Sequence, residues 1–253
     1  MHPAADLADA LIVRLQPVRD ADLIVTLLDP DRGRVDAYAR SARKSSRRFG
    51  GRLQLFALGR ARLTQAKGGL PQLSEFERSA DLAPSSVDWP LLCLCSTIAE
   101  LAAVASQPEH ADPELHRWAC ASLRACDDLA PSRLRLASLA VDLGFLQAVG
   151  SLPDVSRCSV CAGDLTVGAT WEDANEGWSC LACRPTAGPT IDAAACAAVA
   201  ALVLDPHAAR TVFLSRRVGR LVRGHADALL ADVLPRPLRT REPLREALAL
   251  IEV

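Results

Sequence analysis

Residues 22–40 read DLIVTLLDPDRGRVDAYAR and join two apolar segments through a turn. The turn, residues 29–33, contains proline and glycine, which favour a tight reversal of the chain. The segments Asp22–Leu28 and Arg34–Arg40 are therefore expected to pair as a β-hairpin. In the second segment apolar and polar residues alternate, so one side of the strand is expected to be buried and the other to face solvent.

Comparable segments lie on both sides of the hairpin. Leu11–Leu15 precedes it, and Leu53–Thr64 and Leu73–Arg78 follow it with apolar residues at alternate positions. Five short strands with a basic, glycine-bearing loop fit a small closed barrel of the oligonucleotide-binding (OB) type, and an SH3-like barrel gives a similar pattern. We expect residues 1–80 to form an OB-fold β-barrel as the N-terminal domain of an α+β protein.

Positive charge is concentrated between Arg40 and Lys67. This segment holds nine basic residues and no Asp or Glu, whereas the whole chain has a formal net charge of −1. Such a cluster offers many phosphate contacts and is typical of nucleic-acid binding, although a solvated basic loop without a ligand has the same composition. The candidate nucleic-acid contacts are Arg34, Tyr38, Arg40, Arg43, Lys44, Arg47, Arg48, Arg52, Arg60 and Arg62.

Tyr38 is the single tyrosine of the chain and is expected on the solvent-facing side of its strand, beside arginines. A nucleic-acid base could stack on its ring. The position has a second explanation, because tyrosine is in any case favoured in strands.

The chain becomes helical after a proline- and serine-containing linker at residues 81–86. Apolar residues then recur at helical spacing, and proline or glycine marks the ends of the segments. We expect a helical domain at residues 81–156 and 187–253, with residues 157–186 inserted between its two parts. The expected helices are Pro90–Ala105, Glu114–Leu129, Pro131 to about Leu143 with Gly144 as its end, Ile191–Leu204, Thr211–Val233 and Glu242–Leu250.

Four cysteines in the inserted segment form the most specific motif of the sequence. Two Cys-x-x-Cys pairs, Cys158 with Cys161 and Cys180 with Cys183, are separated by eighteen residues. Each pair lets two thiolates from one turn reach the same ion, and two pairs complete a tetrahedral zinc site. Because four thiolates fill the coordination shell, the predicted Zn²⁺, one per chain, is structural and not catalytic. A redox role lacks a surrounding βαβ pattern.

Composition bears on the compartment of the protein. The cysteines are odd in number and no signal peptide is recognisable, so thiols and metal ligands are expected in place of disulfides. The longest uncharged apolar run, Ala193–Leu204, is too short to span a bilayer. We expect a cytoplasmic protein with no membrane partner. The cysteines expected to be small buried side chains in helices are Cys93, Cys95, Cys120 and Cys126.

The expected helix Thr211–Val233 carries Arg216, Arg220 and Arg223 on one face. That face is either a second nucleic-acid contact or an ordinary solvated surface.

The order of these parts resembles the bacterial RecO family of recombination mediators: a basic barrel, a linker, a helical domain interrupted by a four-cysteine site, and a helical tail. Short motifs carry the same resemblance over nearly the whole chain. They are residues 22–28, 33–35, 39–44 and 51–56, and further on residues 99–101, 133–146, 152–154, 158–161 and 236–240. Ser41 and Leu55 depart from the family pattern, which usually has glycine and proline at these two positions.

The resemblance implies a non-enzymatic mediator of DNA repair. Such a protein binds single- and double-stranded DNA, anneals complementary strands coated with single-strand binding protein, and acts with RecR to load the RecA recombinase, whose filament it meets only indirectly. On this reading the basic residues of the barrel neutralise phosphates without reading base edges. The protein would be cytoplasmic and associated with the nucleoid when bound to DNA.

Two other classes of function are compatible with the residues alone. A zinc-containing RNA-binding or translation accessory protein would use the same barrel and the same metal site. An enzyme is disfavoured because the histidines have no partner motif, and because the sequence has neither a P-loop nor a dinucleotide-binding glycine motif. The histidines considered are His110, His116, His207 and His225.

Overall fold

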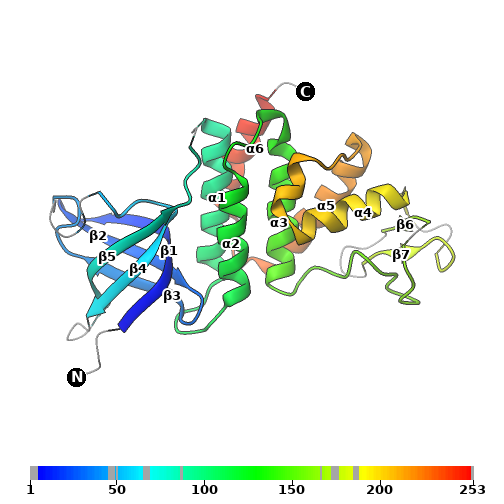
Figure 1. Ribbon diagram of the computed structural model, residues 1–253. Coiled ribbons are helices and arrows are strands. Elements are labelled where there is room, and N and C mark those ends of the chain that lie inside the picture. Colours follow the sequence, from blue (N-terminus) through cyan, green and yellow to red (C-terminus); the bar gives the residue numbers. More distant parts are fainter. Residues whose placement is uncertain are drawn as a thin grey trace. The chain divides into compact units, whose positions relative to one another are not determined.

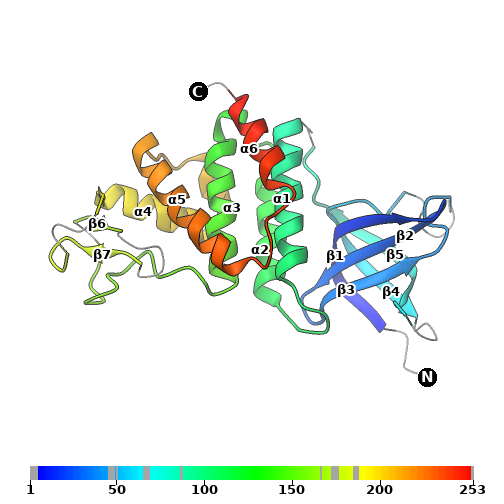
Figure 2. The ribbon, with the colours of Figure 1, turned by 180° about the vertical axis from the view of Figure 1, so that it is seen from behind.

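The computed structural model describes residues 5–44, 49, 51–64, 69–85, 88–165, 167–171, 177–184 and 188–251. These residues form an N-terminal β-barrel, followed by helices and a small three-stranded sheet (Figures 1 and 2). The α+β class with an N-terminal barrel, predicted from the sequence, is confirmed. The chain divides into two compact units, residues 1–128 with 238–244, and residues 129–237 with 245–253. The domain boundaries expected after residues 80, 156 and 186 stay predictions.

The barrel of the first unit closes in the strand order β1-β2-β3-β5-β4. Neighbouring strands are antiparallel, except that β3 and β5 run parallel where Tyr38 lies opposite Gln72. This arrangement is that of the predicted OB-fold. The strands are β1 (Ala5–Val18), β2 (Asp22–Asp29), β3 (Gly33–Ala39), β4 (Ala57–Thr64) and β5 (Gln72–Asp81).

The interior of the barrel is filled by alternate residues from all five strands. Several of them are alanines, whose small side chains leave room for the fully buried rings of Phe49 and Phe76. The buried core residues are Leu7, Ala10, Ile12, Leu23, Val25, Leu27, Ala37, Ala39, Phe49, Ala57, Ala61, Leu63, Leu73 and Phe76.

β1 belongs to both sides of the barrel, because it pairs with β4 along its first half and with β2 along its second half. Its pairing with β2 shifts in register between Ile12 and Arg14. A shift of this kind bends the strand and increases its twist, which closure of a small barrel requires. Gly59 has a similar role on β4, where a β-carbon would lie 2.2 Å from the carbonyl oxygen of Glu77.

Two helices complete the first unit, α1 (Trp89–Ala105) and α2 (Pro113–Ala125). Each follows an aspartate, Asp88 or Asp112, whose side chain accepts a hydrogen bond from the backbone N–H three residues later, at 2.8 and 3.0 Å. The helices contact each other, and both contact the barrel. Burial raises the pKa of the Cys120 thiol to about 12. The four cysteines expected to be buried here, Cys93, Cys95, Cys120 and Cys126, are buried.

The β2–β3 hairpin forms as residues 22–40 predict, and its tip meets the connection between α1 and α2. The side chain of Asp29 accepts two backbone hydrogen bonds within the turn, each of 3.1 Å. Gly33 has a φ of +66°, and a β-carbon there would lie 2.1 Å from the carbonyl oxygen of His110. Glycine is therefore required at this position both by the backbone conformation and by the close approach of the connection.

The second unit is organised around α3 (Leu134–Ala148), which contacts α4 (Ala193–Leu204) and α5 (Arg216–Val233). Asp142 on α3 is fully buried and accepts a hydrogen bond from Arg223 on α5. A buried carboxylate needs such a partner. The remaining elements are η1 (Pro131–Arg133), η2 (Pro206–Arg210), β6 (Ala169–Thr170), β7 (Ser179–Cys180) and β8 (Thr190–Ile191), with α6 (Arg241–Ala249) near the C-terminus.

Several expected element boundaries are wrong. β1 extends well beyond the expected strand Leu11–Leu15, and α2 ends at Ala125, before the expected Leu129. α5 begins at Arg216 and not at Thr211, because the side chain of Ser215 caps the helix by accepting from Val218 N.

α3 continues through Gly144, because Phe145 and Leu146 extend its buried face and outweigh the cost of about 1 kcal/mol for a glycine inside a helix. It ends just before Gly150, whose φ is +71°. The strand expected from Leu53 begins only at Ala57, since the residues before it form a turn in which Phe56 has a φ of +70°. Within the described residues, no helix combines the length and apolar character needed to cross a membrane.

Candidate nucleic-acid interface and metal centre

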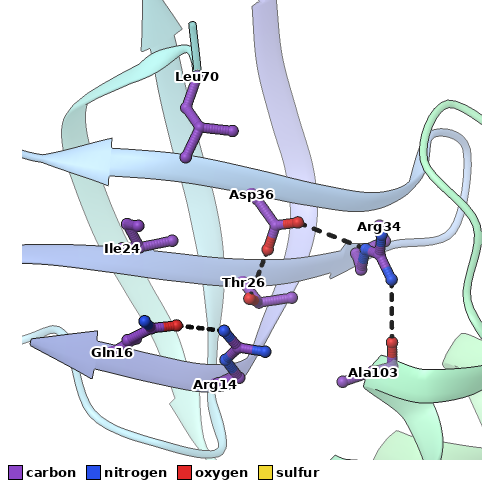
Figure 3. Close-up of a pocket in the computed structure, with 8 residues that line it drawn as sticks. All are labelled: Arg14, Gln16, Ile24, Thr26, Arg34, Asp36, Leu70 and Ala103. Atoms are coloured by element: carbon purple, nitrogen blue, oxygen red, sulfur yellow. Dashed lines mark hydrogen bonds and ion pairs between the residues drawn. The ribbon is translucent and has the colours of Figure 1, made fainter.

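The outer face of β1, β2 and β3 carries a shallow pocket of about 280 Å³ (Figure 3). Its floor is built from cross-strand neighbours, with Arg14 opposite Thr26 and Thr26 opposite Asp36. In the next row Gln16 lies opposite Ile24. Leu70 and Ala103 lie at the margins of the pocket, and Arg34 lines it beside Ala103.

Sequence reasoning missed Arg14 and Gln16 as site residues. The signal was present, because the two polar residues alternate with Val13 and Leu15 and so continue the two-residue period of a strand. On the pocket floor, Thr26 Oγ1 donates to Asp36 Oδ1 at 2.6 Å, and the Arg14 guanidinium donates to the side-chain oxygen of Gln16.

Arg34, a predicted nucleic-acid contact, extends toward the C-terminal end of α1 (Figure 3). Its Nη1 donates to the carbonyl oxygens of Ala103 at 3.3 Å and Ser106 at 3.4 Å, and its Nε lies 3.4 Å from Asp36 Oδ2. The carbonyl end of a helix carries partial negative charge, so the guanidinium fastens β3 to α1. A phosphate contact at Arg34 stays a prediction, and it would compete with these bonds.

Tyr38 is half-buried on the same outer face, opposite Ile24 of β2. Its hydroxyl donates to the carboxylate of Asp22, which also accepts a hydrogen bond of 2.7 Å from the backbone N–H of Ser41. These two bonds, the one from Tyr38 first, lower the pKa of Asp22, and the same bond raises the pKa of Tyr38. The tip of the ring is thereby held in place. Base stacking on Tyr38 stays a prediction.

The basic loop predicted between the third and fourth strands begins directly after β3. For Arg43, Lys44 and Arg52, the described part of the chain supplies no carboxylate partner; Arg43 Nη1 instead donates to the carbonyl oxygen of Asp20 at 3.5 Å. The exposed cations here are Arg40, Arg43, Lys44 and Arg52. Arg47 and Arg48 lie outside the described residues.

The two candidate arginines of β4 have different surroundings. Arg60 is exposed and lies opposite Glu77 of β5 in the strand register. Arg62 lies between two carboxylates, with its Nη1 2.9 Å from Glu75 Oε2 and its Nε 3.4 Å from Asp6 Oδ1. These ion pairs neutralise much of the positive charge at Arg62, so a phosphate there would have to displace them. The contacts predicted at both residues stay predictions.

The four cysteines predicted to bind zinc come together in the second unit. The Sγ atoms of Cys158, Cys161, Cys180 and Cys183 all lie within 4.8 Å of one another, and those of Cys161 and Cys180 are 3.9 Å apart. A tetrahedral site with Zn–S bonds of about 2.3 Å has sulfur–sulfur distances of about 3.8 Å. The donor set and its spacing therefore fit a four-coordinate thiophilic ion.

Two tight turns present these thiols. In the first, Ala162 N donates to the carbonyl oxygen of Cys158 at 2.8 Å, and Ala162 has a φ of +57°. In the second, Cys183 N donates to the carbonyl oxygen of Cys180 at 3.1 Å. The turns are tied together because Cys180 N donates to Cys158 Sγ at 3.2 Å. Each turn therefore directs both of its thiols to the same point.

The electrostatic surroundings differ between the cysteines. Burial acts to raise the pKa of Cys158, but backbone N–H groups, including those of Cys180 and Val160, donate to its sulfur and bring the pKa down to about 6. For Cys183, hydrogen bonding with the thiols of Cys180 and then Cys161 raises the pKa to about 12. A bound cation would favour the thiolate of every ligand.

Aromatic rings attach the cysteine segment to α5. Trp171 stacks on His225, with ring centres 4.1 Å apart and planes at 7°, and Trp178 meets Trp171 edge-on at 5.2 Å. Both tryptophans are buried. His225, which sequence reasoning treated as a histidine without a partner motif, thus has a packing role.

The three arginines predicted on one face of α5 have different surroundings in the structure. Arg223 pairs with buried Asp142 and also donates to Ser138 Oγ at 3.3 Å, whereas Arg216 and Arg220 are exposed. Arg223 is therefore part of the packing of α5 on α3. A nucleic-acid contact through Arg216 and Arg220 stays a prediction.

Comparison with known proteins gives two family matches. The description "Recombination protein O N terminal" matches residues 5–80, and "Recombination protein O C terminal" matches residues 87–242. The chain belongs to the RecO family. The RecO N-terminal match coincides with the OB-fold barrel, and the RecO C-terminal match contains the four cysteines.

Curated RecO-family relatives cover much or nearly all of the chain. The DNA repair protein RecO of Anaeromyxobacter sp. (strain K) is 32% identical over 93% of this chain and 94% of that protein. The DNA repair protein RecO of Myxococcus xanthus is 27% identical over 92% of this chain and 93% of that protein. The same-named protein of Desulfatibacillum aliphaticivorans is 33% identical over 68% of this chain and 65% of that protein.

Proposed function

We propose that this chain is a non-enzymatic mediator of DNA repair that binds DNA through its barrel. It binds single- and double-stranded DNA, anneals complementary strands coated with single-strand binding protein, and acts with RecR in loading RecA. It works in the cytoplasm, at the nucleoid when bound to DNA. Membership of the RecO family and the name of the relatives, DNA repair protein, support the proposal.

The observation that carries the proposal is the open cationic loop after β3. Arg43, Lys44 and Arg52 are exposed, and the described residues place no carboxylate in an ion pair with any of them. A cation that contacts a phosphate releases a condensed counterion, so affinity for a single strand falls with salt, with a logarithmic slope of about 0.7 per contact. Phosphate contacts carry no sequence information, which suits a protein that must act on any strand.

Annealing follows from the same charges. Two complementary strands repel each other through their phosphates, and a cationic surface that holds both reduces this repulsion. Zn²⁺ bound by the four cysteines would hold the cysteine segment together, and its filled coordination shell has no place for a reacting water. The mechanism therefore requires binding and release, without a chemical step.

A charge-reversal experiment tests the proposal. The double variant Arg43→Glu/Lys44→Glu is compared with Arg117→Glu/Arg124→Glu, which makes the same charge change at exposed positions of α2 in the same unit. At low salt the loop variant is expected to lose roughly 100-fold in affinity for a single strand, because two contacts become repulsive. Annealing of complementary oligonucleotides, followed by fluorescence, should fall with it, whereas the α2 variant keeps both activities.

Full annealing by the loop variant would remove the loop from the mechanism. An RNA strand of the same sequence provides a second comparison. Binding of RNA in clear preference to DNA would favour the alternative of an RNA-binding accessory protein over a DNA-repair mediator.

A further inference from the structure

We infer that the pocket on the outer face of β1, β2 and β3 receives one unstacked base of a single strand, while the phosphates of that strand lie on the exposed cations beside it. The inference rests on the proposed function and adds a base contact to the phosphate contacts on which that function depends. Figure 3 shows the residues that carry it.

The floor of the pocket suits a neutral group better than a phosphate. Asp36 stands in its floor, and Arg34 is occupied by that carboxylate and by two carbonyl oxygens of α1. Arg34 and Asp36 form an ion pair that is neutral as a whole, so Arg14 supplies the net charge of the pocket and can meet a phosphate beside it, whereas a group on the floor lies against the Asp36 carboxylate. A nucleobase carries no net charge, and its edge presents both hydrogen-bond donors and acceptors.

The apolar residues of the pocket suit the flat face of a ring. Ile24 rises from the middle strand, and Leu70 reaches toward the same space from the connection before β5 (Figure 3). Leu70 is 40% exposed although it is a large apolar side chain, so contact with a base would remove apolar surface from water. Pockets for drug-sized molecules measure about 300–1,000 Å³. At about 280 Å³ and open to solvent, this pocket lies just below that range, so it suits a small group such as a single ring.

Polar groups of the pocket remain available to the edge of a base. Thr26 is buried in the floor and donates its proton to Asp36, whose side chain is 34% exposed and keeps lone pairs that can accept a hydrogen bond from a base. Gln16 accepts from Arg14 through its oxygen, which leaves its NH₂ group to donate. This acceptor on β3 and this donor on β1 match the mixed edge of a base better than they match a phosphate, which only accepts.

The pocket is continuous with the other candidate contacts. Tyr38 lies opposite Ile24 in the strand register, and its hydroxyl is fixed by Asp22, which also holds the backbone at Ser41. The cationic loop begins there. A strand with one base in the pocket can therefore place its next base at Tyr38 and the following phosphates on the loop. Bases paired inside a duplex cannot enter the pocket, so this contact distinguishes single strands from duplexes.

A comparison of strands with and without bases tests the inference. Affinities for oligothymidine and for an abasic oligonucleotide of equal length are measured by fluorescence anisotropy at the same salt concentration. Leu70→Ala is expected to weaken oligothymidine binding about fivefold and to leave abasic binding unchanged, because the two ligands have the same phosphates. The matched control is Leu55→Ala, which truncates the same residue type at a similar exposure of 37% outside the pocket and should change neither affinity.

A cross-linking measurement provides the second readout. An oligonucleotide with one photoreactive 4-thiothymidine should cross-link to peptides containing β1, β2 or Leu70. Equal affinities of the wild-type protein for both strands, an equal loss of both in Leu70→Ala, or cross-links confined to other peptides would overturn the pocket and leave the cationic loop standing. Tight binding of free thymidine monophosphate would also overturn it, in favour of a free nucleotide. If neither strand bound the wild-type protein, the proposed function itself would fail.

Discussion

The barrel and the four-cysteine segment are both built from short strands, yet different forces stabilise them. The barrel has an apolar core to which all five strands contribute, so many side chains share the stabilisation. The cysteine segment has strands of two residues, few buried apolar side chains beyond Trp171 and Trp178, and four thiols gathered at one point. A distributed core tolerates the weakening of one member, whereas a metal site requires every ligand.

Removal of one cysteine ligand of the metal site should have the largest effect on structure. Cys158→Ala is expected to lose its zinc and the folded structure of the cysteine segment, because binding contributes about 10–16 kcal/mol to folding in zinc-finger peptides. Zinc content by mass spectrometry and hydrogen exchange in residues 177–184 measure the two losses. Exchange in β2 should stay slow, since the barrel does not depend on the metal.

Cys196→Ala is the matched control for that variant. Cys196 is also a buried cysteine of the second unit, but it lies on α4 outside the thiol cluster. It should retain one zinc per chain. A full complement of zinc in Cys158→Ala would contradict the structural role of the site.

Lowering the pH should have the second-largest effect, and it should destabilise the cysteine segment before the barrel. Ligand thiols must be deprotonated to bind metal, so protons compete for them as the pH falls. Cys158, with a pKa of about 6, resists this competition down to about pH 6, whereas the proton of Cys183, with a pKa of about 12, must be displaced by the metal even at neutral pH. Zinc release to a chromogenic chelator is therefore expected to rise steeply between about pH 7 and 5.

The barrel should be unaffected in this range. The folded-state pKa of Asp22 is lowered, so its contribution is present above its unfolded value of about 3.9 and is lost only as the pH falls through the lower folded value. Exchange in β2 should accordingly stay slow while zinc is released. A barrel that opened together with zinc loss would contradict the independence of the two regions.

Phe76→Ala tests the distributed core with a smaller change. Phe76 is fully buried among side chains from several strands, and its truncation is expected to cost about 3–5 kcal/mol of unfolding free energy. Denaturant titration followed by hydrogen exchange in β2 gives the magnitude, and zinc content should stay at one per chain. Truncation of the exposed Leu55 in the same unit should cost much less.

Arg62→Gln should have the smallest effect. Although Arg62 pairs with two carboxylates, it is about half exposed, and exposed ion pairs contribute about 0–1 kcal/mol. Thermal unfolding should therefore shift by little. A loss comparable with that of Phe76→Ala would show that surface charges, and not the core, stabilise the barrel.

The sequence predicted most of the fold because its signals were local. The turn at residues 29–33 fixed the β2–β3 hairpin, and the paired spacing of Cys158 to Cys183 predicted the thiol cluster. The C-terminal end of α3 could not be predicted from local signals. The packing of Phe145 and Leu146 continues the helix, although Gly144 on its own favours a helix end. Local propensity is a weak guide wherever distant contacts decide.

The candidate site was less accessible to sequence reasoning. Charge counting treated Arg34, Arg43 and Arg62 alike, but Arg34 bonds to carbonyl oxygens of α1, Arg62 lies between carboxylates, and Arg43 is open to solvent. Those partners are distant in sequence and become visible only in three dimensions. The pocket was missed for the same reason, since its lining comes from three strands, a loop and a helix.

The contact at Gly33 determines how the protein should be dissected. The hairpin tip meets the α1–α2 connection without room for a single methyl group, and the neighbouring Arg34 N–H donates to Gln107. A fragment cut behind the fifth strand would lose the hydrogen bonds that the backbone N–H and the guanidinium of Arg34 donate to the carbonyl oxygens of Gln107, Ala103 and Ser106, and would uncover the hairpin tip that packs there. Truncations made for crystals or spectroscopy should therefore keep the barrel together with both helices, and should retain residues 238–244, which belong to the same unit.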